Sequence, residues 1–334
     1  MPYRAPVKEM TFYLENVLDA GRISETEKFA EATSDMIDAI LGEAAKLSEE
    51  ILAPLNVAGD LHPAYLENGV TRCSPGYDAG YKAIAEGGWV GMAGAPEFGG
   101  MGLPLALTSC VGEMMSSACL SLSLNPLMTQ GQIEALEHHA SNEIKALYLP
   151  KLISGQWTGT MNLTEAGAGS DVGALRSKAE DNGDGTFSIT GQKIFISWGD
   201  HDIAENICHL VLARLPDAAV GTKGISLFLV PKYLPDTAGN PGVMNSAVAI
   251  RLEHKMGLHG SPTAVMDFAG ATGWMIGSEG GGLAAMFTMM NNARIGVGVQ
   301  GLSQAEAATQ KALEYVMERK QGRSPVEGGT GTIL

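Results

Sequence analysis

The stretch "GTMNLTEAGAGSDVGAL", residues 159–175, decides the fold, because its glycines at 167, 169 and 173 spell G-x-G-x-x-x-G. Such a loop cradles a dinucleotide when a strand precedes it and a helix follows it inside a βαβ unit. Here the following residues instead alternate polar and apolar on both sides of "NGDG", residues 182–185, which is typical of a β-hairpin. No crossover helix fits between Leu175 and the strand around Phe187, so the sequence argues against a nicotinamide-type dinucleotide fold.

The residues alone leave two interpretations of this loop. Glycine-rich segments often form plain surface turns with no ligand, and hydroxyl residues such as Thr164 and Ser170 often cap such turns. Alternatively, these hydroxyls and the backbone amides of Gly169 and Ser170 converge on one phosphate oxygen, as nests of amides do.

The sequence on either side of the loop divides into three parts. Residues 29–53 carry apolar groups at steps of three, four and seven, which predicts an amphipathic helix, and further helices are expected at 77–88, 104–120, 127–140 and 141–154. Short strand-like segments follow the loop, and a helical pattern returns from Gly281. We therefore expect an α+β protein with a helical domain over 1–157 (1–28 being an extension), a β domain over 158–280, and an incomplete helical region over 281–334.

The composition of the chain excludes several classes of function. The 334 residues include 45% apolar and 18% charged residues, as in globular proteins, and the net charge of −15 argues against nucleic acid as a partner. Four scattered cysteines are typical of reduced core thiols, and no group of His, Cys and acidic residues has metal-ligand spacing. The sequence has no apolar run of about 18 residues, so we expect no membrane span, no secretory signal and a cytoplasmic location.

A resemblance to a known family rests on six motifs that occur in order along almost the whole chain. They are "EFGGMGLP" (97–104), "YLPKLISGQW" (148–157), "NLTEAGAGSDV" (162–172), "GQKIFIS" (191–197), "EHKMGLHGSPT" (253–263) and "ARIGVGVQGLSQAEAA" (293–308). In this order they resemble the acyl-CoA dehydrogenases, with Ala166 where the family commonly has Pro. The long N-terminus, "LAPLNVAGD" (52–60) and "GTMNLTE" (159–165) look most like the methylmercaptopropionyl-CoA dehydrogenase branch.

The resemblance implies a fold and an FAD site. The fold is an N-terminal helical domain, a middle antiparallel β-barrel domain and the start of a C-terminal helical bundle. FAD would lie between the β domain and the C-terminal helices, with Met161, Leu163 and Thr164 lining the isoalloxazine. Gly169 and Ser170 would hold the pyrophosphate, and Ser170 would also touch the acyl-CoA.

Two further flavin contacts are implied on a strand. Phe195 takes the place of a common Trp that forms an aromatic plate, and Ser197 the place of a Thr that donates a hydrogen bond near flavin N5. Strand alternation alone favours an inward-pointing core side chain at Phe195 about as much.

The last helix carries the remaining implied contacts. Asn291 and Arg294 would lie beside the acyl-CoA, although Arg294 falls within an apolar stripe and a buried salt bridge is the structural alternative. Arg319 and Gln321 match positions that reach the FAD of a neighbouring subunit, so the resemblance implies a homodimer or homotetramer.

The implied activity is FAD-dependent α,β-dehydrogenation of an acyl-CoA, with electrons passing to an electron-transferring flavoprotein. The family base usually follows late in the C-terminal helical domain, and its alternative position before the arginine is Ala293 here, so we expect a C-terminally truncated chain whose catalytic residue lies beyond Leu334. His201, His254, Glu165 and Asp171 are weaker candidates, because lone histidines and acids are more often structural. An acyl-CoA oxidase, a flavin monooxygenase and a non-catalytic flavin- or acyl-CoA-binding scaffold remain alternatives.

Overall fold

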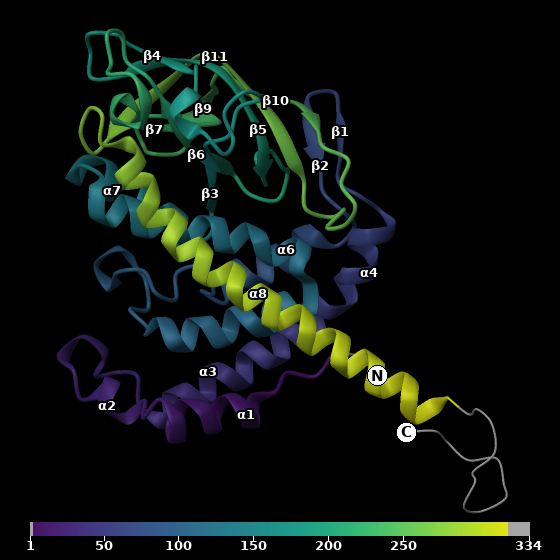
Figure 1. Cartoon of the computed structure of the whole chain (residues 1–334). Helices are drawn as coiled ribbons and strands as arrows, with labels where there is room; N and C mark the ends of the chain where they lie inside the picture. The colour runs from purple at the N-terminus through teal and green to yellow at the C-terminus, as the bar shows by residue number, and fades with distance from the viewer. Residues whose placement is uncertain (1–2, 320–334) are drawn as a thin grey trace, which may run out of the picture.

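The computed structural model describes residues 3–319, and Figure 1 shows a β domain above layers of helices, with one long helix crossing both. The α+β class predicted from the sequence is confirmed. The helices before the β domain are α1 (Val7–Phe12), a π-helix (Tyr13–Val17), α2 (Gly21–Ser24), a 3-10 helix (Glu27–Phe29), α3 (Ser34–Lys46), a π-helix (Leu47–Leu52), α4 (Ala53–Leu61), α5 (Tyr77–Glu86), a 3-10 helix (Pro96–Phe98), α6 (Leu105–His139) and α7 (Asn142–Ile153). The hairpin β1 (Tyr65–Glu67) and β2 (Val70–Arg72) lies between α4 and α5.

The amphipathic helix expected over 29–53 begins later than the periodicity suggests. Thr33 caps α3, because its hydroxyl oxygen accepts a hydrogen bond from the Met36 amide at 3.4 Å. From Ser34 the chain stays helical through the π-helix and α4 to Leu61, and Ile37 and Leu41 of α3 face the core. Pro54 therefore lies inside this continuous helical run, just after the π-helix, and does not follow the end of the helix.

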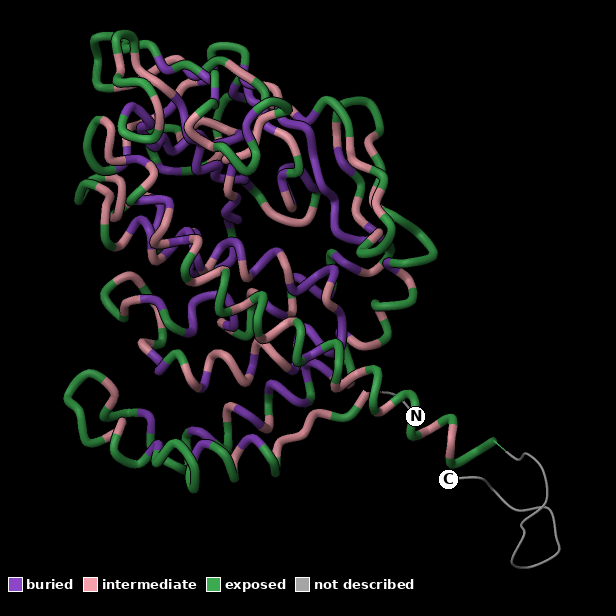
Figure 2. Tube along the Cα trace, viewed as in Figure 1, coloured by how far each residue is buried: buried purple, intermediate pink, exposed green. Residues whose placement is uncertain are grey.

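The central helix α6 joins two predicted helices into one element. Its backbone leaves the helical region only at Cys119 (φ −152°, ψ 85°), and Pro126 lies inside the second half. By length and composition α6 is the one helix among the described residues that passes a test for a membrane span. Most of that stretch is buried in the protein, as expected of a core helix, and Figure 2 shows buried residues along it.

The β domain is one curled sheet. Its strands are β3 (Trp157–Asn162), β4 (Lys178–Asp181), β5 (Phe187–Ser197), β6 (Asn206–Ala213), β7 (Ser226–Pro231), β10 (Ala247–Leu252) and β11 (Thr263–Ile276). A 3-10 helix (Val172–Ala174) precedes β4, and another (Gly221–Gly224) precedes β7. The separate pair β8 (Tyr233–Pro235) and β9 (Pro241–Met244) lies between β7 and β10 in the chain. The order is β3-β6-β7-β11-β5-β4, with β10 also on β11. All pairs are antiparallel except β3 with β6, and a bridge between Lys178 and Arg214 brings β4 back to the end of β6. The sheet thereby approaches a closed barrel around a small apolar core that includes Phe228 and Phe268.

Two close contacts place the β domain on the helices. β3 lies on α6. Gly159 of β3 leaves room for the Gln132 side chain, and the Gly159 backbone amide donates a hydrogen bond to the Thr129 hydroxyl at 3.0 Å. The long helix α8 (Gly282–Glu318) begins beside β7 and packs along α6, as Figure 1 shows.

Candidate functional site

The glycine-rich segment is a loop between β3 and β4, with no crossover helix. Its tight turn lies at 165–168, where the amides and carbonyls of Glu165 and Ala168 pair with each other at 3.0 and 3.1 Å. Gly169 and Ser170 follow this turn and are exposed. Because β3 leads through this loop to β4 without a helix, the argument against a βαβ dinucleotide unit is confirmed.

The first part of the loop is joined to the end of β5. The Thr164 carbonyl oxygen accepts a hydrogen bond from the Ile194 amide at 2.9 Å, which places Leu163 and Thr164 beside Phe195. Met161, Leu163 and Thr164 are all half-buried. The structure thus brings together the loop and strand residues that the resemblance assigns to the flavin ring.

Phe195 does not follow the alternation of its strand. Its φ of 60° is left-handed, and its register with β11 contains an extra residue between Lys193 and Ile196, which is a β-bulge. The ring is 61% exposed, so the inward-pointing alternative is wrong: the bulge turns the side chain outward. A left-handed phenylalanine costs about 1–2 kcal/mol, and such strain is concentrated at functional sites.

Sequence reasoning missed two cations that hold the loop. Arg214 donates to the carbonyl oxygens of Gly173 (2.5 Å), Leu175 (3.0 Å) and Gly221 (2.8 Å), which ties the distal end of the loop to β6. Lys193 is completely buried and pairs with Glu165 at 2.8 Å. Arg214 belongs to none of the six motifs, whereas Lys193 lies within "GQKIFIS" (191–197), and a lysine inside a predicted strand was a signal that could have been used.

Glu165 is occupied as a structural acceptor. Burial favours a higher pKa of its carboxyl group, but the Lys193 ammonium and the hydrogen bonds from Ser177 and Arg176 outweigh burial, so the net pKa is lowered. A carboxylate held in this way is a poor proton acceptor, which argues against the role of base.

The buried histidines are also structural. His201 Nε2 lies 2.8 Å from the Thr158 hydroxyl, and burial lowers the pKa of His201 to about 4. His209 Nδ1 lies 2.8 Å from the Thr160 hydroxyl, and burial lowers its pKa to about 3. Both therefore remain neutral at pH 7. His254 is exposed and stacks on His259 with ring centroids 6.3 Å apart. Within residues 3–319 no three His, Cys, Asp or Glu residues are grouped to hold a metal ion.

Arg294 of α8 is exposed, which corrects the expectation of a charge buried in an apolar stripe. Its guanidinium lies over the Phe287 ring at 5.1 Å and donates to Asn291 Oδ1 at 3.1 Å. This face of α8 points away from the core, so the Arg294 guanidinium needs no buried salt-bridge partner. Arg319 is also exposed, with its guanidinium 5.4 Å from the Tyr315 ring centroid, whereas Gln321 lies outside the described residues.

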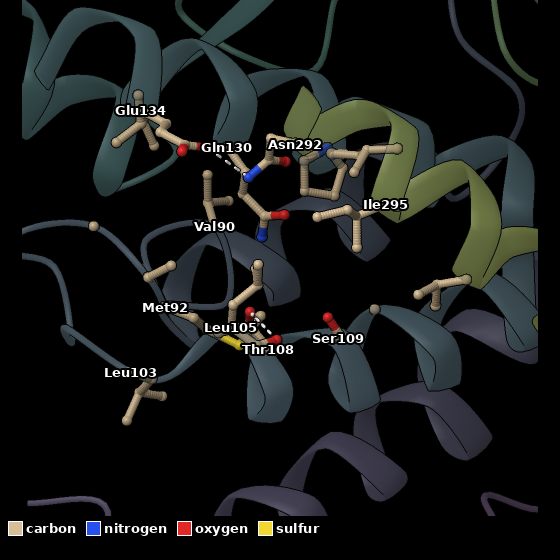
Figure 3. A pocket seen from close by; sticks show the side chains of 18 of the residues that line it. Val90, Met92, Leu103, Leu105, Thr108, Ser109, Gln130, Glu134, Asn292 and Ile295 are labelled. Carbon is tan, nitrogen blue, oxygen red and sulfur yellow. Dashed lines mark hydrogen bonds between the residues drawn. The ribbon is translucent and has the colours of Figure 1, made fainter. Parts of the chain in front are cut away.

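A cavity of about 290 Å³ lies between α6, α8 and the loop before α6, as Figure 3 shows. Apolar side chains from the loop and α6 meet Ile295 of α8 there; they include Val90, Met92, Leu103 and Leu105. Polar groups lie on two sides of the cavity: Thr108 and Ser109 on one, and on the other Glu134, whose Oε2 accepts a hydrogen bond from Asn292 Nδ2 at 2.9 Å. The arrangement suits a mainly apolar chain that enters between two helices.

Comparison with known families gives two matches. The acyl-CoA dehydrogenase N-terminal domain matches residues 62–156, and the acyl-CoA dehydrogenase middle domain matches residues 160–271. The chain belongs to the acyl-CoA dehydrogenase family. The resemblance read from the six motifs is thereby confirmed, and the two matches fall within the helical and β regions described above.

Individual relatives agree with this family. The chain is 45% identical to 3-methylmercaptopropionyl-CoA dehydrogenase of Ruegeria pomeroyi, covering 98% of this chain and 56% of that protein. It is 35% identical to a butyryl-CoA dehydrogenase of Syntrophomonas wolfei, covering 96% and 54%. The solved butyryl-CoA dehydrogenase of Megasphaera elsdenii aligns with a TM-score of 0.72 at 25% identity, covering 87% and 71%. The chain thus spans about half the length of these two curated relatives.

Proposed function

We propose that this chain provides the FAD and acyl-CoA sites of an enzyme that dehydrogenates acyl-CoA thioesters between the α- and β-carbons. The observation that carries the proposal is Phe195, an aromatic ring held outward by a strained bulge beside the exposed hydroxyl loop. An exposed flat apolar plate next to half-buried Leu163 and Thr164 fits a planar ring system such as isoalloxazine. The relatives named above support the thioester class.

The residues would divide the work as follows. Bound FAD would supply an acceptor for the hydride of the β-carbon. Met161, Leu163 and Phe195 exclude water from one side of the ring system, and the hydroxyls of Thr164 and Ser197 donate hydrogen bonds to its edge. Gly169 and Ser170 bind the pyrophosphate through backbone amides and the serine hydroxyl, which is also offered to the acyl-CoA.

The acyl group would enter the cavity between α6 and α8. Asn291 and Arg294 lie on the exposed face of α8 and would bind the polar part of the acyl-CoA. Candidate substrates are 3-methylthiopropanoyl-CoA and short- to medium-length straight-chain acyl-CoAs. The acceptor of the α-proton is assigned to no residue of this chain.

The remaining proposals concern assembly. We infer a homodimer or homotetramer in which Arg319 and Gln321 reach the FAD of a neighbouring subunit, an electron-transferring flavoprotein as the oxidant, and a cytoplasmic location. The division into 1–157, 158–280 and 281–334 is kept as the working domain scheme.

The test is anaerobic reduction of the bound flavin. Full-length protein reconstituted with FAD is mixed with 3-methylthiopropanoyl-CoA, butanoyl-CoA and octanoyl-CoA, and the flavin absorbance is followed. Bleaching by at least one thioester, with slow reoxidation in air and fast reoxidation by electron-transferring flavoprotein, is the expected result. Binding without bleaching would favour a scaffold, and rapid reoxidation in air would favour an oxidase or monooxygenase.

A further inference from the structure

A buried ion pair lies directly beneath the residues assigned to the flavin ring. Lys193 Nζ lies 2.8 Å from Glu165 Oε1 and donates to the Leu163 carbonyl oxygen at 3.2 Å. The lysine side chain is 0% exposed and that of Glu165 is 11% exposed. Burying an ammonium group is unfavourable unless its partners are well placed, so this pair needs an explanation.

The carboxylate joins three separate segments. Glu165 Oε1 also accepts hydrogen bonds from the Ser177 amide (3.0 Å) and hydroxyl (2.6 Å), and Oε2 accepts one from the Arg176 amide at 2.7 Å. Gly191 makes this possible, because a Cβ at that position would fall 2.4 Å from the Ser177 hydroxyl oxygen. The loop after β3, the segment before β4 and the strand β5 therefore meet at one carboxylate.

The lysine stands at the start of the β5 bulge. Lys193 points inward, Ile194 donates to Thr164, and Phe195 turns outward within the next two residues. The Leu163 carbonyl bound by the ammonium immediately precedes Thr164. One pair thus fixes both the loop hydroxyl and the aromatic ring, although it contacts neither side chain.

We propose that Glu165 and Lys193 form a positioning pair, which holds the Thr164 hydroxyl and the Phe195 ring in the geometry that binds the flavin. The inference rests on the proposed function, because it assigns these two side chains to the FAD site. It does not make either residue a proton donor or acceptor in the reaction.

The same domain supplies a matched control. Lys232 Nζ lies 2.6 Å from Asp200 Oδ1, with side-chain exposures of 11% and 4%, so this pair has the same chemistry and similar burial. The second carboxylate oxygen of Asp200 accepts a hydrogen bond from the Thr71 amide at 2.9 Å, which holds the β1–β2 hairpin. None of its hydrogen bonds reaches 163–165 or 193–195.

The experiment compares Lys193→Met, Glu165→Gln, the double variant, and Lys232→Met. Two quantities are measured: hydrogen exchange of the Ile194 amide in the protein without flavin, and the FAD dissociation constant from flavin fluorescence and visible circular dichroism. Lys193→Met should accelerate exchange of the Ile194 amide at least tenfold and raise the FAD dissociation constant at least tenfold. Lys232→Met should lower the melting temperature but change the exchange rate and the FAD dissociation constant less than threefold.

The double variant separates positioning from stability. Removing both charges should restore the melting temperature toward wild type, because no unpaired charge stays buried. The double variant should still bind FAD at least tenfold more weakly than wild type, because the donor to the Leu163 carbonyl is still missing. A double variant that binds FAD like wild type, or a Lys232→Met variant equally impaired in FAD binding, would overturn the inference.

Failure of the proposed function gives a different pattern. If the wild-type protein binds no FAD, the function and the link of the pair to flavin both fall. Unchanged Ile194 exchange in Lys193→Met, with normal FAD binding by the wild type, would refute the positioning pair alone.

Discussion

Glu134 of α6 and Asn292 of α8 lie side by side at the edge of the cavity and are joined by a hydrogen bond of 2.9 Å. The two residues are 158 positions apart, so this contact couples the helical domain to the helix that follows the β domain. It joins the two helices that line the cavity which an acyl chain would enter.

The cavity can be filled from Gly112. This residue lines the cavity, and a Cβ added there meets no atom within 4 Å. Gly112→Ala should raise the free energy of unfolding by about 0.5–1 kcal/mol, because glycine is unfavourable inside a helix. Gly112→Phe should weaken octanoyl-CoA binding at least tenfold in calorimetric titrations and leave FAD affinity within threefold. Unchanged thioester affinity in a folded Gly112→Phe protein would show that the acyl chain binds elsewhere.

Phe195 combines backbone strain with a proposed ligand contact. Gly adopts its φ of 60° without cost, whereas Ala retains the strain. Phe195→Gly should therefore be about 1 kcal/mol more stable than Phe195→Ala in urea unfolding of the protein without flavin. Both variants lack the ring, so both should lose FAD affinity by a similar factor of at least ten. If Ala and Gly unfold at the same urea concentration, the bulge is not strained.

Gly159, in the segment that decides the fold, is required by the contact with α6. A Cβ there would fall 2.3 Å from Gln132 Oε1, so Gly159→Ala should destabilise the protein by about 1–3 kcal/mol. Gln132→Ala in the same chain should recover most of this loss. Gly167→Ala is the control from the same loop, because its added Cβ meets nothing within 4 Å. Thermal unfolding of these three variants tests the contact, and a Gly159→Ala change no larger than that of Gly167→Ala would contradict it.

The neutral histidines make stability depend on pH. The folded pKa values of His201 and His209, about 4 and about 3, lie below the value of 6.5 from which burial lowers them. Between these limits the unfolded chain binds protons that the folded chain does not, so stability is complete above pH 6.5 and falls as the pH decreases. Between pH 6 and its own folded pKa, each histidine should remove about 1.4 kcal/mol of stability per pH unit.

His209→Gln tests this dependence. Urea unfolding at pH 7, 6 and 5 should show a shallower loss of stability in the variant than in wild type, whatever its stability at pH 7. His254→Gln is the control, because His254 is exposed. Equal slopes for wild type and His209→Gln would mean that His209 is not buried as a neutral base.

The local sequence pattern was enough to predict many of the helices and strands. The "NGDG" hairpin lies between β4 and β5 as expected, because the turn residues and the alternation on both sides favour one local geometry. The break expected between the helices over 104–120 and 127–140 is only partly present: the backbone leaves the helical region at Cys119, but α6 continues beyond it and across Pro126. Tertiary burial of this helix outweighs the missing amide of the proline, and burial is not visible in a window of a few residues.

The sequence by itself determined the α+β class, the order of the three regions, the exclusion of a βαβ unit around 159–175 and, through its motifs, the family. Contacts and exposure of side chains followed only from the tertiary structure. The contacts are the Glu165–Lys193 pair and the Glu134–Asn292 hydrogen bond, and the exposed side chains are Phe195 and Arg294. Periodicity and turn chemistry act over a few neighbouring residues, so they can be read along the chain. The bulge in β5 and the burial of Lys193 depend on the register with β11 and on a loop 28 residues away, which are fixed only when the sheet has formed.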